Sequence, residues 1–310
     1  MNLKQLSVKL YERSFRKLTT SDKEWVTKAC EADGGEGAHI HYLTMLLVQE
    51  MYPGDKFRNY CGCVVKGSWE QDGKLYCQYP IGSPENRIKA VKKIINLYSH
   101  QYKQFVFFGL SEETLQELQG IYGQNITDTL NDRDSQEYML DVAELLALEG
   151  PEYSNLRTKM RRFNRNVSWT YEEITKDNIA DCIALSEKWY AEHTDSETAI
   201  GEKRSSDLMF SHYFDYNYRG GLFRVDGNVI AFCVGAPFSD KIFMNIIRKA
   251  DTAYRDSTLS LVYEFAKASC SEFQYVNDSC DLGIPGLRTF KTLLHCKYMN
   301  PFYFVTLNFE

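Results

Sequence analysis

Four polar residues near the C-terminal end of the chain have types and a spacing that suit group transfer: Asn277, Asp281, Arg288 and Lys291. Acyl transfer needs a group that accepts the proton of the nucleophile and donors that stabilise the developing oxyanion. We expect Asp281 and Lys291 to be catalytic, with Asp281 orienting or deprotonating the attacking group. On a helix, Arg288 and Lys291 would share one face and could together hold a phosphate or a carboxylate of a substrate.

The same four residues also have a structural interpretation. Asp281 could be the N-cap of the helix that follows it, and Arg288 could be its ion-pair partner. Asn277, at the end of an expected strand, could bond a substrate amide or only bridge backbone groups. The sequence leaves both interpretations open.

A basic segment in the middle of the chain is a second candidate binding region. A helix there could contact the phosphates of tRNA or of another polyanion, and we assign Arg157 and Lys159 to substrate binding. Tyr153, just before them, could line a cleft between two halves of the chain. The alternatives are a solvated helix face for the cations and core packing for Tyr153. The cations of this segment are Arg157, Lys159, Arg161, Arg162 and Arg165.

Other sequence features exclude several classes of site. His39 and His41 follow a glycine cluster but have no third ligand close in the sequence, so we expect no metal site. The chain has no Gly-x-Ser-x-Gly, P-loop or Gly-x-Gly-x-x-Gly motif, which gives no support to a hydrolase elbow, an NTPase or a Rossmann enzyme. The nine cysteines are scattered without a Cys-x-x-Cys pair, a pattern typical of reduced thiols in the cytoplasm.

Charge and hydropathy limit the partners of the chain. Lys and Arg total 36 against 42 Asp and Glu, and a net charge of −6 does not suit a general DNA-binding protein. The apolar segments are too short to span a bilayer, and no segment is typical of a signal peptide. We therefore expect a cytoplasmic protein with no integral membrane segment.

The elements that must position these residues follow from periodicity and turn signals. Ser21 with Glu24 forms a capping box, and Ser83 before Pro84 is an N-cap followed by proline at the first helical position. Turns at 71–73 and 226–228 each contain Asp-Gly and predict hairpins, the first between 61–66 and 74–79. Helices are expected at 21–30, 42–51, 84–98, 115–118, 151–164, 179–189, 259–266 and 287–294, and strands at 61–66, 74–79, 105–108, 138–140, 169–174, 222–225, 229–234, 242–247, 273–276 and 298–307, with a further element at 205–218.

The order of elements divides the chain into two halves. Each half offers early helices, antiparallel strands, then a helix and further strands, and the pattern restarts near residue 166. We expect an α+β fold with mixed sheets and two domains, residues 1–165 and 166–310. The halves share this order without evident sequence identity.

Three segments resemble one known family. Residues 275–291, YVNDSCDLGIPGLRTFK, resemble the Y-x-N…D-L-G-x-x-G-L-R-x-x-K signature of the phosphatidylglycerol lysyltransferase C-terminal family. Residues 150–163, GPEYSNLRTKMRRF, are similar to the basic helix that joins the two halves of that family. Residues 223–232, FRVDGNVIAF, are similar to its hairpin.

The resemblance implies two tandem GNAT-like domains, related to those of Fem-type peptidyltransferases. It also implies an acyl or aminoacyl transferase that acts on a small polar acceptor with an amino or hydroxyl group, a lipid headgroup included. The donor would be aminoacyl-tRNA or an acyl-coenzyme A. A different class of protein fits the same fold, namely a catalytically inactive one that binds a small ligand or a polyanion.

Two positions depart from the family pattern. Arg248 stands where the strand at 242–249 should carry an acidic residue. Asp256-Ser257-Thr258 replaces the glycine-bearing turn that supplies bare backbone N–H groups to a pyrophosphate at a helix N-terminus. Coenzyme A is the only cofactor that the resemblance suggests, and a carboxylate at Asp256 would oppose its binding.

Overall fold

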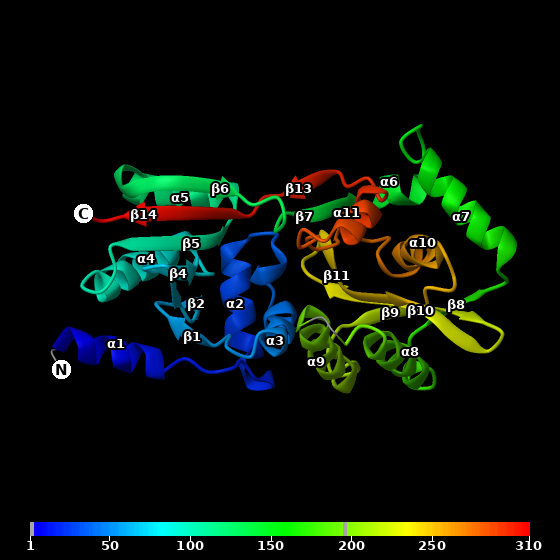
Figure 1. Ribbon diagram of the computed structural model, residues 1–310, viewed down its shortest axis with the longest axis horizontal. Helices are drawn as coiled ribbons and strands as arrows, with labels where there is room; N and C mark the ends of the chain where they lie inside the picture. The colour runs from blue at the N-terminus through cyan, green and yellow to red at the C-terminus, as the bar shows by residue number, and fades with distance from the viewer. Residues whose placement is uncertain (1–2, 195–196) are drawn as a thin grey trace. The chain divides into compact units, whose positions relative to one another are not determined.

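The computed structural model describes residues 3–194 and 197–310 and divides the chain into two compact units. Residues 1–136 and 300–310 form unit 1, and residues 137–299 form unit 2. Both units combine helices with mixed sheets, as the sequence predicts (Figure 1). Among the described residues, no helix is both long and apolar enough to cross a lipid bilayer.

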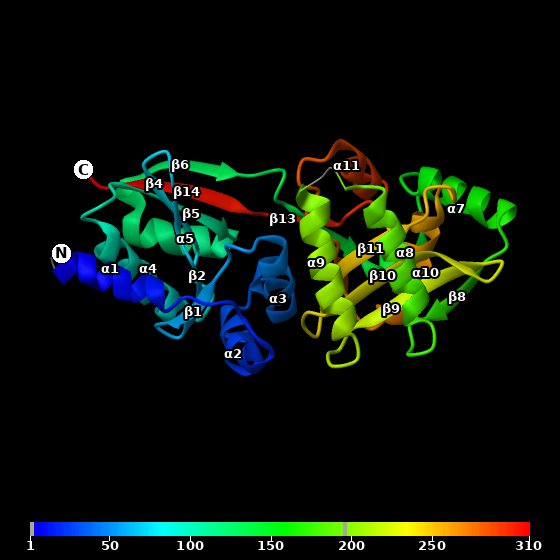
Figure 2. The same ribbon diagram turned by 60° about the horizontal axis from the view of Figure 1, so that its bottom comes forward.

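Unit 1 is built on a five-stranded sheet. The C-terminal strand β14 lies antiparallel between β5 and β6, as Figure 2 shows, in the order β3-β4-β5-β14-β6. A two-stranded ribbon, β1 with β2, lies beside it. The elements are α1 (Leu3–Arg13), α2 (Lys23–Asp33), α3 (Tyr42–Met51), β1 (Phe57–Tyr60), β2 (Cys63–Lys66), β3 (Trp69–Gln71), β4 (Lys74–Gln78), α4 (Pro84–Tyr98), β5 (Gln104–Leu110), α5 (Glu112–Tyr122), β6 (Ile126–Asn131) and β14 (Tyr303–Asn308), with short 3-10 turns at Thr20–Asp22, Ala38–Ile40 and Gly123–Asn125.

The core of unit 1 lies between helix α4 and the sheet. Helix α4 has the expected bounds and the expected N-cap, Ser83, with Pro84 at its first position. Its apolar residues recur at helical spacing, so Val91 and Ile94 face the sheet and are buried beside Phe105 and Phe107 of β5. This helix is the element that the sequence predicts most directly.

Unit 2 is built on a seven-stranded sheet in the order β13-β7-β12-β11-β10-β9-β8. Helices α8 and α9 lie on one face of it and α10 on the other (Figure 1). The elements are β7 (Glu137–Asp141), α6 (Val142–Ala147), α7 (Ser154–Asn166), β8 (Thr170–Glu173), α8 (Ile179–Ala191), α9 (Glu197–Ser211), β9 (Arg219–Val225), β10 (Asn228–Pro237), β11 (Ile242–Ala250), α10 (Ser257–Ser269), β12 (Tyr275–Asn277), α11 (Pro285–Thr292) and β13 (Tyr298–Asn300).

Strands β11 and β12 form a short parallel pair that positions the C-terminal motif. They pair only from Ile242 with Tyr275 to Met244 with Asn277, although β11 continues to Ala250. Strand β12 ends at Asn277, and the chain then turns toward α11. The motif therefore lies where two neighbouring strands stop pairing.

The division of the chain differs from the expected one. The expected boundary at 165/166 falls inside unit 2, at the end of α7, whereas the units separate at 136/137. The expected strand at 298–307 is two strands: β13 joins the seven-stranded sheet and β14 the five-stranded sheet. Long-range strand pairing determines both results, and local periodicity does not report it.

Two local predictions also need correction. The Asp72-Gly73 turn does join a hairpin, but the partners are β3 and β4, while β2 pairs with β1. The capping box lies two residues earlier than expected, because Thr19 and Asp22 form it at the start of the 3-10 turn before α2. The second hairpin, β9 with β10 across Asp226-Gly227, agrees with the prediction.

Candidate functional site

The candidate site is the junction between β12 and α11, where the chain passes from strand to helix as expected. Three non-extended positions shape its loop, since Ser279, Leu282 and Gly283 all have positive φ. Leu282 and Ile284 are 49% and 46% exposed, so the tip of the loop reaches solvent. Asp278, Asp281 and Lys291 of the motif are buried.

Asp281 is fully buried, and its carboxylate is surrounded by donors. Arg288 donates from Nε at 2.9 Å and from a terminal nitrogen at 2.7 Å, and the Tyr138 hydroxyl donates at 2.6 Å. The backbone N–H of Gly283 adds a bond of 3.0 Å. The bonds from Arg288 hold the pKa of Asp281 well below its ordinary value.

A carboxylate held in this way is a weak base. Of the two roles expected for Asp281, the geometry suits orientation of a neighbouring group better than removal of a proton. The ion pair with Arg288 matches the structural alternative, but the N-cap does not, because α11 begins at Pro285 with Ile284 as its N-cap. Of the pair, only Arg288 reaches solvent, with 37% of its side chain exposed.

Lys291 hydrogen-bonds the backbone of the loop between β12 and α11. Its ammonium donates to the carbonyl oxygens of Asp278, Ser279 and Cys280, the last two at 3.1 and 2.9 Å. Only 5% of its side chain is exposed, and burial lowers its pKa. Arg288 and Lys291 therefore do not form the shared anion clamp that their spacing predicts, because each bonds different loop groups. A catalytic role for Lys291 stays a prediction.

A second buried ion pair lies beside the first and was not predicted. Arg248 of β11 donates to both carboxylate oxygens of Asp278, at 2.8 and 3.1 Å, and Asn245 donates at 2.9 Å. These side chains bridge β11 to the chain after β12, just beyond the point where the two strands stop pairing. Although burial opposes it, Arg248 and Lys291 keep the pKa of Asp278 below its ordinary value. The sequence feature that could have pointed to Asp278 is its position inside the 275–291 motif.

Asn277 is buried and bonded within the junction. Its amide nitrogen donates to Glu137 at 2.7 Å, and its amide oxygen accepts from the backbone N–H of Ser279 at 2.8 Å. It therefore joins β7 to the loop after β12, which agrees with the bridging alternative. A contact with a substrate amide stays a prediction.

The basic helix α7 combines structural and exposed cations. Arg157 donates to the carbonyl oxygens of Leu148 and Gly150, which closes the loop before the helix. Tyr153 is buried, with its ring edge-on to His295 at 5.1 Å between centroids, so core packing is its observed environment. Arg161 and Arg165 are exposed. The two cations assigned to substrate binding, Arg157 and Lys159, are both partly buried.

The start of α10 does not fit a pyrophosphate. Asp256 occupies the N-cap of this helix with φ +68°, and its side chain makes no cap hydrogen bond to the helix. Lys159, at 3.7 Å, and Arg162 pair with that carboxylate. A carboxylate at the N-cap of this helix opposes a pyrophosphate by like charge, and no step of a reaction is assigned to coenzyme A.

Comparison with known proteins places the chain in context. The family model described as phosphatidylglycerol lysyltransferase, C-terminal, matches residues 61–306. None of the curated proteins compared with the chain matches it.

Three solved structures share the fold. A conserved protein of unknown function from Bacteroides thetaiotaomicron has 22% identity and a TM-score of 0.82, covering 95% of this chain and 99% of that one. The structure of L-PGS from Bacillus licheniformis has 12% identity and a TM-score of 0.58, covering 92% and 91%. FemX has 9% identity and a TM-score of 0.59, covering 94% and 96%. The likeness confirms the α+β fold with two tandem GNAT-like halves that the resemblance implied.

Proposed function

Because the chain belongs to the phosphatidylglycerol lysyltransferase C-terminal family, we propose that it transfers an aminoacyl or acyl group to a small polar acceptor with an amino or hydroxyl group. The family match over residues 61–306 carries this proposal. A lipid headgroup is one acceptor of this kind, and aminoacyl-tRNA is the proposed donor. The misfit of Asp256 to a pyrophosphate favours that donor over an acyl-coenzyme A.

Arg288 is the motif residue that we place in contact with substrate. Its guanidinium is held by two bonds to Asp281, so little side-chain entropy is lost when it binds a phosphate or a carboxylate. Asp281 and Lys291 act as positioning residues in this proposal. Asp281 fixes the guanidinium, and Lys291 fixes the loop through its three bonds to backbone carbonyls.

The proposed location of this activity is the cytoplasm. In the part of the chain that the structure describes, none of the nine cysteines forms a disulfide, and Cys63, Cys77 and Cys233 are buried thiols. Unpaired thiols persist in a reducing compartment, where charged tRNA is also made. The acceptor would therefore be a cytoplasmic small molecule or a headgroup reached from the cytoplasmic side.

Transfer of a labelled amino acid from a mixture of charged tRNAs tests the proposal. The acceptors are phosphatidylglycerol vesicles, small amines and small alcohols, with labelled acetyl-coenzyme A as a parallel donor. We expect transfer from tRNA, and we expect Arg288→Lys to lower it by about tenfold or more, because lysine cannot form the bidentate bonds. Arg13→Gln, at an exposed arginine of α1, is the matched control. Absence of transfer from both donors to every acceptor contradicts the proposal.

The second candidate is a catalytically inactive binding protein on the same fold. The motif carboxylates Asp278 and Asp281 are both buried in ion pairs, and Asp256 puts a negative charge at the N-cap of α10. Ligands that bind only the native state raise its apparent stability, so thermal-shift screening separates the two candidates. Stabilisation by aminoacyl-adenylate analogues, with turnover of charged tRNA, supports the transferase. Stabilisation by metabolites without turnover supports the binding protein.

A further inference from the structure

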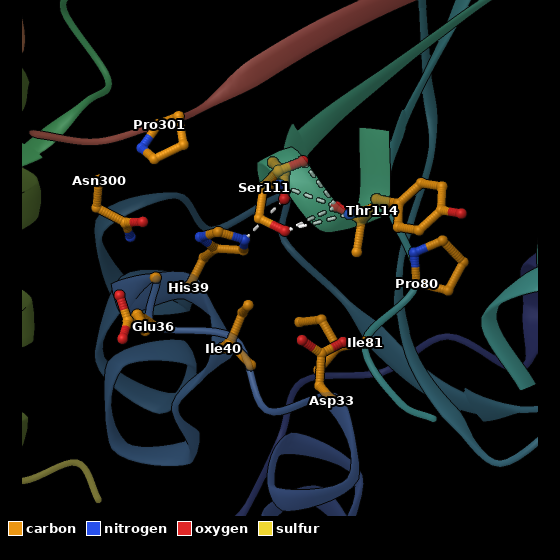
Figure 3. A pocket seen from close by; sticks show the side chains of 13 residues that line it. Asp33, Glu36, His39, Ile40, Pro80, Ile81, Ser111, Thr114, Asn300 and Pro301 are labelled. Carbon is orange, nitrogen blue, oxygen red and sulfur yellow. Dashed lines mark hydrogen bonds between the residues drawn. The ribbon is translucent and has the colours of Figure 1, made fainter. Parts of the chain in front are cut away.

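A polar recess lies in unit 1, whereas the motif junction belongs to unit 2. Its cavity volume is about 20 Å³, room for one water-sized group such as an ammonium head, and it is open to solvent on one side. Figure 3 shows its side chains, which come from the end of α2, the 3-10 turn at Ala38–Ile40, the chain after β4, the start of α5 and the segment before β14. The polar side chains among them are Asp33, Glu36, His39, Tyr79, Ser111, Thr114 and Asn300.

His39 is the unusual group of the recess. Its Nε2 lies 3.0 Å from the carbonyl oxygen of Gly109, and a carbonyl oxygen can only accept. Nε2 is therefore the donor of this bond, and in the tautomer with its proton on Nε2 the ring presents Nδ1 as an acceptor. Nδ1 is buried and has no hydrogen-bond partner among residues 3–194 and 197–310. Figure 3 shows it on the side of the recess where Asn300 is drawn.

Two glycines leave the space that the imidazole ring of His39 occupies. A Cβ at Gly109, where φ is +79°, would lie 3.2 Å from Nε2 of His39. A Cβ at Gly37 would lie 2.8 Å from Nδ1 and 2.6 Å from the neighbouring ring carbon. Side chains at either position would displace the ring, so the backbone is shaped to hold His39 closely on both sides.

The charges around the recess favour a cation. Asp33 and Glu36 line it, and none of the described residues that line it is a lysine or an arginine. Arg87, the buried cation behind it, pairs with Asp33 at 3.1 Å and with Glu117 at 3.0 Å. One guanidinium thus faces two buried carboxylates, and Glu36 adds a further negative charge. A positive ligand would lower the electrostatic free energy of this arrangement.

We propose that this recess binds the ammonium group of a small organic ligand, with His39 Nδ1 accepting one N–H and Glu36 supplying the opposite charge. A buried acceptor without a partner is costly, and an ammonium donor would satisfy it. The ammonium group has three donors, enough for His39 and the neighbouring carboxylate together. This inference is independent of the transfer activity, because none of its residues belongs to the motif junction.

A strip of aromatic rings leads away from His39 and suits an apolar tail on the ligand. Phe302 is edge-on to His39 at 5.4 Å, and Phe304 follows at 5.5 Å. Phe108 lies 5.8 Å from Phe304, and Trp69 lies 5.2 Å from Phe108 and is 41% exposed. Rings in such contact offer dispersion to a flat or aliphatic group. We therefore expect an ammonium ligand with a ring to bind more tightly than one without.

Imidazole NMR tests the proposal on the full chain. Protein labelled with ¹⁵N-histidine is titrated with 2-phenylethylammonium chloride, with 2-phenylethanol as the neutral analogue and 3-phenylpropionate as the anionic one. His39→Gln assigns the resonance. We expect a saturable shift of the His39 Nδ1 signal with the ammonium probe only, and a weaker apparent affinity for propylammonium.

Two glutamate variants separate a specific site from general attraction. Glu36→Gln should weaken binding by about fivefold, the size of one partly exposed ion pair. Glu31→Gln, at an exposed glutamate of α2 outside the recess, should leave binding unchanged. Thermal unfolding checks that both variants are folded. An unmoved His39 signal, equal binding of the neutral analogue, or an unchanged affinity in Glu36→Gln would overturn the proposal.

Discussion

Replacing Lys291 by methionine separates a structural role of this residue from a catalytic one. Methionine keeps most of the side-chain volume but removes the ammonium group and its three donors. The carbonyl oxygens of Asp278, Ser279 and Cys280 would lose their donor, and the Asp278 carboxylate would lose a cation at 3.8 Å. The perturbation is therefore confined to the loop between β12 and α11.

The expected cost follows from the burial of these groups. A buried acceptor left unpaired costs about 1–3 kcal/mol, and removing one partner of a buried ion pair costs about 3–5 kcal/mol. The two figures describe overlapping contacts, so they are not added. We expect a loss of about 3–5 kcal/mol in the free energy of unfolding, which corresponds to a fall in Tm of roughly 10 °C for a unit of this size.

Urea denaturation followed by tryptophan fluorescence measures the loss. Lys267→Met is the matched control, because 65% of that side chain is exposed and its glutamate partner, Glu264, lies 4.0 Å away. We expect the control to change stability by less than about 0.5 kcal/mol. If Lys291→Met changes stability as little as the control does but abolishes transfer, the structural reasoning is refuted and Lys291 acts on the substrate.

Three further results are expected. Asp281→Asn should destabilise the protein at pH 7, and the difference in free energy of unfolding from the native protein should shrink below about pH 4. The reason is that the pKa of Asp281 is lowered in the folded state, which contributes stability above the pKa of the unfolded state that is lost in acid. Equal differences at pH 7 and pH 3 in urea titrations would contradict this. Asp256→Gly should give measurable pyrophosphate binding by calorimetry, since glycine adopts φ +68° readily and the start of α10 would be freed of its carboxylate; no gain in binding would show that the carboxylate is not what opposes the anion. Gly235→Ala should cost about 1–3 kcal/mol by thermal unfolding, because its Cβ would lie 2.4 Å from the carbonyl oxygen of Met244 at the bulge of β10; an unchanged Tm would mean that the bulge adjusts freely.

The local elements were largely predictable because their signals are local. Helix α4 follows from apolar residues at helical spacing after Ser83 and Pro84, and the β9–β10 hairpin follows from Asp226-Gly227 between apolar runs. Helices α7, α10 and α11 lie within a few residues of their predicted bounds. In each case the residues that specify the element are its own neighbours in the chain.

The environment of the motif was not predictable in the same way. Tyr138 reaches Asp281, and Glu137 reaches Asn277, only because β7 pairs with β12. The spacing on α11 placed Arg288 and Lys291 on one face. It could not show that the ammonium group of Lys291 would bond the backbone carbonyls of the preceding loop. Burial and pairing with residues distant in the chain decide which charged side chains of the motif are exposed to solvent.

The amino-acid sequence by itself determined the class of this protein. Its periodicity predicts α+β halves, and residues 275–291 identify the family, because both depend on residues close together in the chain. Only the tertiary structure decided that β14 returns to unit 1, that Asp281 and Lys291 are buried, and that Nδ1 of His39 finds no partner among the described residues. These features depend on contacts between distant segments, whose free energies no local pattern records.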